Sequence, residues 1–138
     1  MIRSTPDIDV CPSGEPGNLE RLAALLADIQ ALRLDVDEEG FTPAGSTAGE
    51  TSAEDLAAGG NFRFDTSLGV LDVMQWLAGI DEDDPYAELS ADAAVAEAFG
   101  VRIQICSLAH LRAMKRAAGR ARDLTDLADL DAAHSSGR

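Results

Sequence analysis

Two aspartates near the start of the chain, separated by a single residue, have a spacing that suits metal chemistry. Residues 7–10, between Pro6 and Pro12, read as a short strand, so Asp7 and Asp9 leave the same face. Two adjacent carboxylates repel each other unless a cation lies between them. Hard oxygen ligands favour Mg²⁺ as that cation. We therefore expect Asp7 and Asp9 to be metal ligands, with Ile8 pointing the other way, into a core.

A third aspartate stands inside an apolar run. Asp72 lies within residues 70–74, which read as a strand, and an adjacent position would bring it beside the other two. Three converging carboxylates suit two metal ions, which lie about 3.5–4 Å apart and stabilise the attacking and leaving oxygens of phosphoryl transfer. Asp72 would then act as a base or as a ligand of the second ion. The alternative is that these aspartates merely solvate the surface of an acidic chain.

Basic side chains gather in one part of the sequence. The chain has 138 residues and a formal net charge of −14, which argues against a protein that coats nucleic acid. Residues 102–122, however, contain arginines and Lys115 and no acidic side chain. This short segment could meet phosphates. For Lys115 the alternative is a cation that complements a helix dipole, and Asp123 or Asp126 could pair with Lys115 or Arg120.

The first half of the chain predicts a strand, a helix and a long loop. Asn18 stands at an N-cap position before apolar residues spaced by three and four, which predicts a helix over 19–33. Residues 35–60 are acidic and then rich in Gly, Ala, Ser and Thr, which favours a loop or a partly disordered insertion. A short helix over 52–58 fits within this insertion.

The second half predicts two hairpins followed by two helices. Alternating apolar residues over 62–74 and over 95–105 each indicate a hairpin, although 91–98 also has high helix propensity. Ser107 would cap a helix that Gly119 interrupts, and Asp123 would open the last helix. The tail from 134 to 138 is expected to fray. These elements predict one α+β domain over 1–133, a mixed sheet with its helices on one side.

The composition favours a cytosolic protein without a membrane span. No apolar run approaches the roughly 20 residues that a spanning helix needs, and the N-terminus lacks the apolar stretch of a signal peptide. Cys11 and Cys106 are too few for a disulfide framework or a structural zinc site.

Three segments resemble bacterial nucleotidyltransferase-like proteins, above all the abortive-infection toxin type and its uncharacterised relatives. Thr5-Pro6-Asp7-Ile8-Asp9-Val10 and the following Asn18-Leu19-Glu20-Arg21-Leu22 look like the first metal-binding strand and helix of that family. Gly69-Val70-Leu71-Asp72-Val73 resembles the strand with the third carboxylate. Residues 107–127 are similar to the closing K-x-x-x-x-R-x-x-D-x-x-D helices. The resemblance covers nearly the whole chain except 35–60.

The resemblance implies a Mg²⁺-dependent enzyme that moves a nucleoside monophosphate from an NTP onto an RNA end or a protein hydroxyl. It implies that Arg3, Thr5, Lys115 and Arg120 contact the nucleotide, with Lys115 facing the active site. The family opens with a helix and a Gly-Ser or Gly-Gly turn that holds the triphosphate. Only six residues precede Asp7, so the sequence predicts a domain truncated at this point, whose activity depends on the absent turn.

A second hypothesis follows from that truncation. The chain would then be a non-catalytic relic or interaction module, such as a toxin–antitoxin component, that keeps the fold without the phosphate-binding turn. An open strand edge would favour a partner chain or a homo-oligomer.

Overall fold

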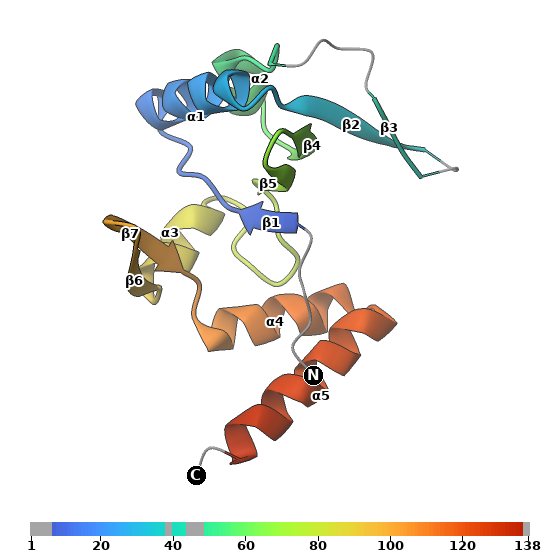
Figure 1. Cartoon of the computed structure of the whole chain (residues 1–138). Coiled ribbons are helices and arrows are strands. Elements are labelled where there is room, and N and C mark those ends of the chain that lie inside the picture. The colour runs from blue at the N-terminus through green and yellow to red at the C-terminus, as the bar shows by residue number, and fades with distance from the viewer. Residues whose placement is uncertain (1–6, 38–39, 44–48, 137–138) are drawn as a thin grey trace. The chain divides into compact units, whose positions relative to one another are not determined.

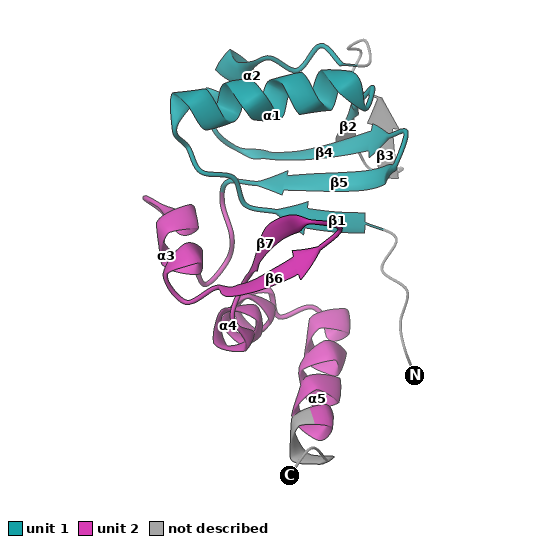
Figure 2. Ribbon diagram, turned by 60° about the vertical axis from the view of Figure 1, so that its left-hand side comes forward, with its two compact units in different colours: residues 1–75 teal, residues 76–138 magenta. Residues whose placement is uncertain are grey.

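The computed structural model of the protein describes residues 7–37, 40–43 and 49–136, with side chains for 7–34 and 49–133 (Figure 1). The chain divides into two compact units, which are described separately: unit 1 is Met1–Gln75 and unit 2 is Trp76–Arg138 (Figure 2). Both units combine helices and strands, which confirms the α+β class. None of the helices in the described part of the chain has both the length and the apolar character that crossing a bilayer requires.

The sheet of unit 1 is built on the predicted hairpin of β4 (Asn61–Thr66) and β5 (Gly69–Met74). Its strands run in the order β1-β5-β4-β2-β3. The sheet is mixed, as expected, because β1 (Asp7–Val10) pairs with β5 in parallel, whereas the remaining pairs are antiparallel. Two strands that the sequence did not predict, β2 (Leu32–Asp37) and β3 (Gly40–Pro43), complete it.

Alternation along β4 and β5 gives this sheet one apolar face. Phe62 pairs with Val73 and Phe64 pairs with Leu71, so these side chains lie on one side of the hairpin. Helices α1 (Pro16–Asp28) and α2 (Ala53–Ala57) cover this face (Figure 2). Leu26, Leu56, Phe64 and Val73 are fully buried between these helices and the strands. Within unit 1, α1 and α2 thus lie on one side of the sheet, as predicted for the first of them.

The first helix is shorter than the sequence predicts, and part of the predicted loop is a strand. Helix α1 begins at Pro16, with Glu15 at the N-cap position instead of the predicted Asn18. It ends at Asp28, after which Gln30 adopts a left-handed conformation with φ 52°. The amide of Ala31 then donates to the carbonyl of Leu26, which closes the helix. Residues 32–37 form β2, so the predicted helix over 19–33 is wrong over 29–33. The segment 35–60 contains strands as well as the suggested short helix α2.

Ile8 does not point into a core as predicted, because its side chain is 66% exposed. It lies on the same face of β1 as Val10, which packs against the core of unit 1. The core of unit 1 therefore covers Val10 and leaves Ile8 exposed. The residue of β1 that packs against the core of unit 1 is therefore Val10.

Unit 2 contains a helix, a hairpin and two more helices. The hairpin of β6 (Ala94–Ala98) and β7 (Val101–Ile105) confirms the strand interpretation of this segment over the helical one. Helix α4 (Leu108–Ala118) begins at the predicted cap, where the Ser107 hydroxyl accepts from the amide of His110, and ends at left-handed Gly119. Helix α3 (Pro85–Ala91) was not predicted; it begins after Asp84, whose carboxylate accepts from the amide of Ala87.

The last helix begins earlier and ends later than the sequence predicts. Helix α5 spans Ala121–Ser136, so Asp123 lies within its first turn instead of opening it. A carboxylate in this turn still stabilises the helix, because it faces the positive end of the helix dipole. The backbone stays helical to Ser136 where a frayed tail was expected, and residues 137–138 lie outside the described part of the chain.

Candidate metal centre

The parallel pairing of β1 with β5 brings the three predicted aspartates together. Asp9 lies directly beside Asp72 in the strand register, and Asp7 lies two residues along on the same face of β1. One carboxylate oxygen from each aspartate lies within 4.8 Å of the other two. We call Asp7, Asp9 and Asp72 the aspartate triad. The sequence-based prediction that these side chains converge is confirmed.

The aspartate triad lies on the sheet face opposite the core of unit 1. Leu71 and Val73 flank Asp72 along β5 and point to the face that the helices cover, so Asp72 must point the other way. The Asp7 and Asp72 side chains are 20% and 19% exposed, and Asp9 is exposed. This partial burial leaves an approach for a solvated cation while it limits the water around two of the three carboxylates.

Arg63 is a member of this site that the sequence did not predict. It pairs with Asp72 across the β4–β5 hairpin and therefore shares its face. One terminal guanidinium nitrogen donates to Asp7 Oδ2 at 2.8 Å, and Arg63 Nε lies 3.4 Å from Asp72 Oδ1. The sequence of the hairpin could have indicated this position. Counting back from the turn between Thr66 and Gly69 places Arg63 opposite Asp72.

The environment of Asp72 favours its protonated form. Partial burial, a hydrogen bond with the Asp9 side chain and the nearby negative charges of Asp9 and Asp7 together raise the pKa of Asp72 to about 6, against the opposing effect of Arg63. A divalent cation bound by the same carboxylates would reverse this shift, because it stabilises their charged forms.

We expect a carboxyl titration near pH 6 that belongs to Asp72. Because its pKa is higher in the folded protein than the usual value of 3.8, the native state binds more protons between these pH values. The free energy of unfolding contributed by this group is therefore present below about pH 4 and is lost as the pH rises through about 6. ¹³C NMR of the aspartate carboxyl carbons in EDTA would show the titration directly.

Asp72→Asn provides the check on stability, since asparagine has nearly the same shape and does not titrate. The difference in unfolding free energy, variant minus wild type, should grow between pH 4 and pH 7 in the absence of divalent ions. Urea denaturation at several pH values measures this difference. An unchanged difference over that range, or an Asp72 midpoint near 4, would contradict the expectation.

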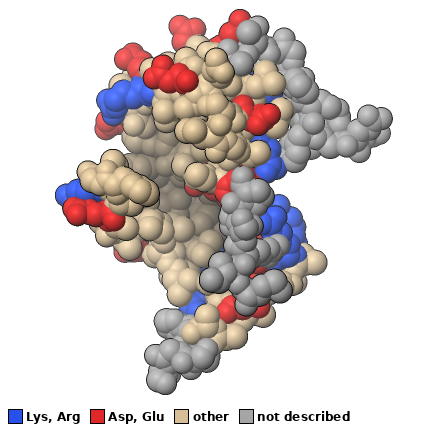
Figure 3. Space-filling model, viewed as in Figure 1, with Lys and Arg blue, Asp and Glu red and all other residues tan. Residues whose placement is uncertain are grey.

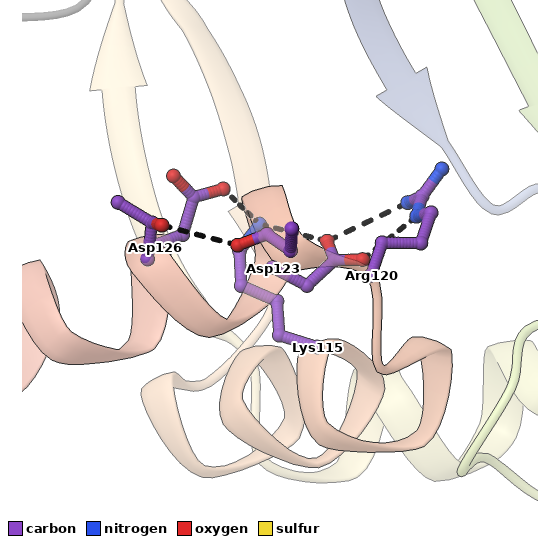
Figure 4. A network of polar contacts seen from close by, with 6 residues as sticks. Lys115, Arg120, Asp123 and Asp126 are labelled. Atoms are coloured by element: carbon purple, nitrogen blue, oxygen red, sulfur yellow. Dashed lines mark hydrogen bonds and ion pairs between the residues drawn. The ribbon is translucent and has the colours of Figure 1, made fainter.

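The predicted phosphate-binding cations lie in unit 2, where they pair with aspartates (Figure 4). Lys115 Nζ lies 2.8 Å from Asp126 Oδ2 and 3.7 Å from Asp123 Oδ1. Arg120 Nε lies 2.7 Å from Asp123 Oδ2. These contacts join the end of α4 to the start of α5, as the salt-bridge alternative predicted. Nucleotide binding by Lys115 and Arg120 stays a prediction.

Asp123 is the centre of this ion-pair cluster. Its side chain is only 5% exposed, and the hydrogen bond from Arg120, helped by the charges of Arg120 and Lys115, holds the pKa of this carboxyl below its usual range. A second link between the helices joins Arg112 to Asp131 at 3.0 Å. Two cations of the basic segment, Arg112 and Lys115, thus connect α4 with α5 in unit 2.

The other two predicted nucleotide contacts, Arg3 and Thr5, lie outside the described residues. Figure 3 shows acidic side chains at several places on the visible face, and within the described residues the oxygens of Asp7, Asp9 and Asp72 lie close enough together to hold a metal ion. The aspartate triad is therefore the candidate site that the geometry singles out. Comparison of the chain with protein-family models, with curated proteins and with solved structures found no match.

Proposed function

We propose that this protein is a nucleotidyltransferase-like protein whose aspartate triad holds Mg²⁺ and the metal-bound triphosphate of an NTP. The observation that supports this proposal is the register of β1 with β5, which places Asp9 beside Asp72 and brings an oxygen of each aspartate within 4.8 Å of the others. The order of the elements also supports the proposal, because it matches the family that the sequence resembles. The acidic pair on β1 is followed by α1, and the third carboxylate lies on a neighbouring strand.

The residues of the site fit a hard divalent cation. Carboxylate oxygens are the ligands that Mg²⁺ prefers, and a cation relieves the repulsion between three carboxylates whose oxygens lie within 4.8 Å of one another. The bound ion would neutralise charge on the phosphates and orient them. Asp7 and Asp9 would hold it from one strand, and Asp72 from the next.

The acceptor would be a hydroxyl of an RNA end or of a protein. In the transfer, the acceptor oxygen attacks the α-phosphorus of the NTP, the bond to the bridging oxygen breaks, and pyrophosphate leaves. The acceptor proton must go to a base, and we assign this role to Asp72, the carboxylate that the resemblance places on the second strand of the site.

The test of the proposal uses the full chain with Mg²⁺ and each of the four NTPs. We expect the melting temperature to rise when Mg²⁺ and an NTP are added together, because a ligand that binds only the folded state stabilises it. Transfer of an α-³²P-labelled nucleotide to RNA or to protein would identify the acceptor. A chain that transfers no label and binds no Mg²⁺–nucleotide with any NTP would overturn the proposal.

A second candidate function is a non-catalytic interaction module, such as one component of a toxin–antitoxin pair. The β6–β7 hairpin favours it, because Val101, Ile103 and Ile105 are 59%, 45% and 52% exposed on one face and Phe99 at its turn is fully exposed. Exposed apolar groups of this kind mark surfaces for protein partners. This candidate predicts no melting-temperature shift with Mg²⁺ and ATP.

A further inference from the structure

The guanidinium of Arg63 is built into the aspartate triad, and this bears on how many ions the site takes. The β4–β5 register fixes its position opposite Asp72, and the buried rings of Phe62 and Phe64 on either side of it anchor the strand. The guanidinium contacts one oxygen of Asp7 at 2.8 Å and one of Asp72 at 3.4 Å. It therefore bridges the two strands that supply the carboxylates.

The charges of the site match one divalent ion better than two. With all three carboxylates ionised, the aspartate triad and Arg63 together carry two negative charges, which one divalent ion neutralises. A second ion would leave two positive charges in a half-buried site. It would also stand about 4 Å from the first, in the space beside the carboxylates where the guanidinium already lies.

We infer that Arg63 takes the place of a second metal ion, so that the aspartate triad binds a single divalent cation. This inference rests on the proposed function and changes the two-ion expectation drawn from the sequence. Asp9, together with Asp7 and Asp72, would hold that ion. Arg63 is a positioning residue, which fixes the carboxylates and supplies the second positive charge.

The experiment measures how many Mn²⁺ ions the full chain binds, with Mn²⁺ as a probe of Mg²⁺. Isothermal titration calorimetry at about 0.2 M KCl screens weak surface binding, and the electron paramagnetic resonance spectrum reports whether two ions lie close together. The variants are Arg63→Gln and Arg63→Lys. Arg21→Gln, an exposed arginine on α1, is the matched control, and circular dichroism checks that each variant folds.

We expect one tightly bound ion in the wild type and in Arg63→Lys, which keeps the charge. In Arg63→Gln we expect affinity at least about tenfold higher, or a second ion with a spin-coupled spectrum, because the repulsion from the guanidinium is gone. Arg21→Gln should match the wild type. If Arg63→Gln does not fold, the count of ions in the wild type and in Arg63→Lys still tests the inference.

The possible failures are distinguishable. Two coupled ions in the wild type would overturn this inference and leave the proposed function standing. Wild-type affinity and stoichiometry in a folded Arg63→Gln would overturn it as well. Binding of no ion by any of the variants would overturn the proposed function itself.

Discussion

Replacing Asp9 by asparagine is expected to weaken Mg²⁺ binding by at least about 100-fold and to abolish the rise in melting temperature with Mg²⁺ and NTP. Loss of groups that merely orient metal ligands already lowers affinity by about 10–100-fold, and the loss of a ligand should exceed that. Asp9 is the exposed member of the aspartate triad and lies directly beside Asp72. Calorimetry with Mg²⁺ and melting curves would measure both effects.

Asp65→Asn is the matched control for this prediction. Asp65 is an exposed aspartate two residues from Arg63 on β4, so its replacement removes the same charge from the same sheet. It should change the affinity by no more than about twofold, because exposed charges outside the site are screened by salt. Equal losses in Asp9→Asn and Asp65→Asn would mean that the ion responds to overall acidity and that the aspartate triad is not a specific site.

Replacing Phe64 by alanine should lower the free energy of unfolding of unit 1 by about 3–5 kcal/mol. Phe64 has no exposed surface, and the centroid of its ring lies 6.1 Å from that of the stacked Phe62 ring. In the strand register, Phe64 lies opposite Leu71. Removing it leaves a cavity under α1 and α2. Amide hydrogen exchange would measure the loss in β4 and β5 separately from unit 2.

The control is another large apolar residue of the same hairpin. Leu68 lies in the turn between β4 and β5 and is 82% exposed, so Leu68→Ala should change the stability by less than about 0.5 kcal/mol. Because β4 and β5 carry Arg63 and Asp72, the Phe64 variant should also bind Mg²⁺ less tightly although no ligand is changed. If the amides of β4 and β5 are as well protected in Phe64→Ala as in the wild type, Phe64 is not a main contributor to the core of unit 1, and the prediction is wrong.

The sequence predicted the elements whose side chains alternate strictly. The hairpin of β4 and β5 has phenylalanines on one strand and Leu71 and Val73 on the other, and the β6–β7 hairpin alternates in the same way. Helix α4 has both a serine cap and a terminal glycine. In each case, local chemistry and tertiary packing favour the same structure.

The missed elements lie where the local signals conflict. Residues 29–34 continue the apolar spacing of α1, but the helix ends at Asp28, and Gln30 adopts a left-handed conformation that usually marks glycine or asparagine. The alternation of residues 32–37, which predicts β2, was hidden by that spacing. Helix α3 was missed because its cap, Asp84, belongs to an acidic run that resembles a loop.

The three carboxylates of the candidate site were predicted from the sequence, whereas the arginine that pairs with them was not. Asp7, Asp9 and Asp72 stand out because acids within a short apolar strand are unusual, and each can be recognised from its own neighbours. Arg63 is recognisable only from the register of the hairpin, which depends on which residues form the turn. Likewise, the partners of Lys115 could be suggested but not chosen until the α4–α5 packing placed Asp126 nearest.

The pairing of β1 with β5 also has a consequence for synthesis on the ribosome. Strand β1 is translated first among the described residues, yet its partner strand ends at Met74. A nascent chain must therefore emerge past this point before Asp9 can meet Asp72, whereas β4 and β5 join locally as soon as they are made. Until then Asp7 and Asp9 stay apart from Asp72, so the aspartate triad forms in one step, when the strand that was made first docks against β5.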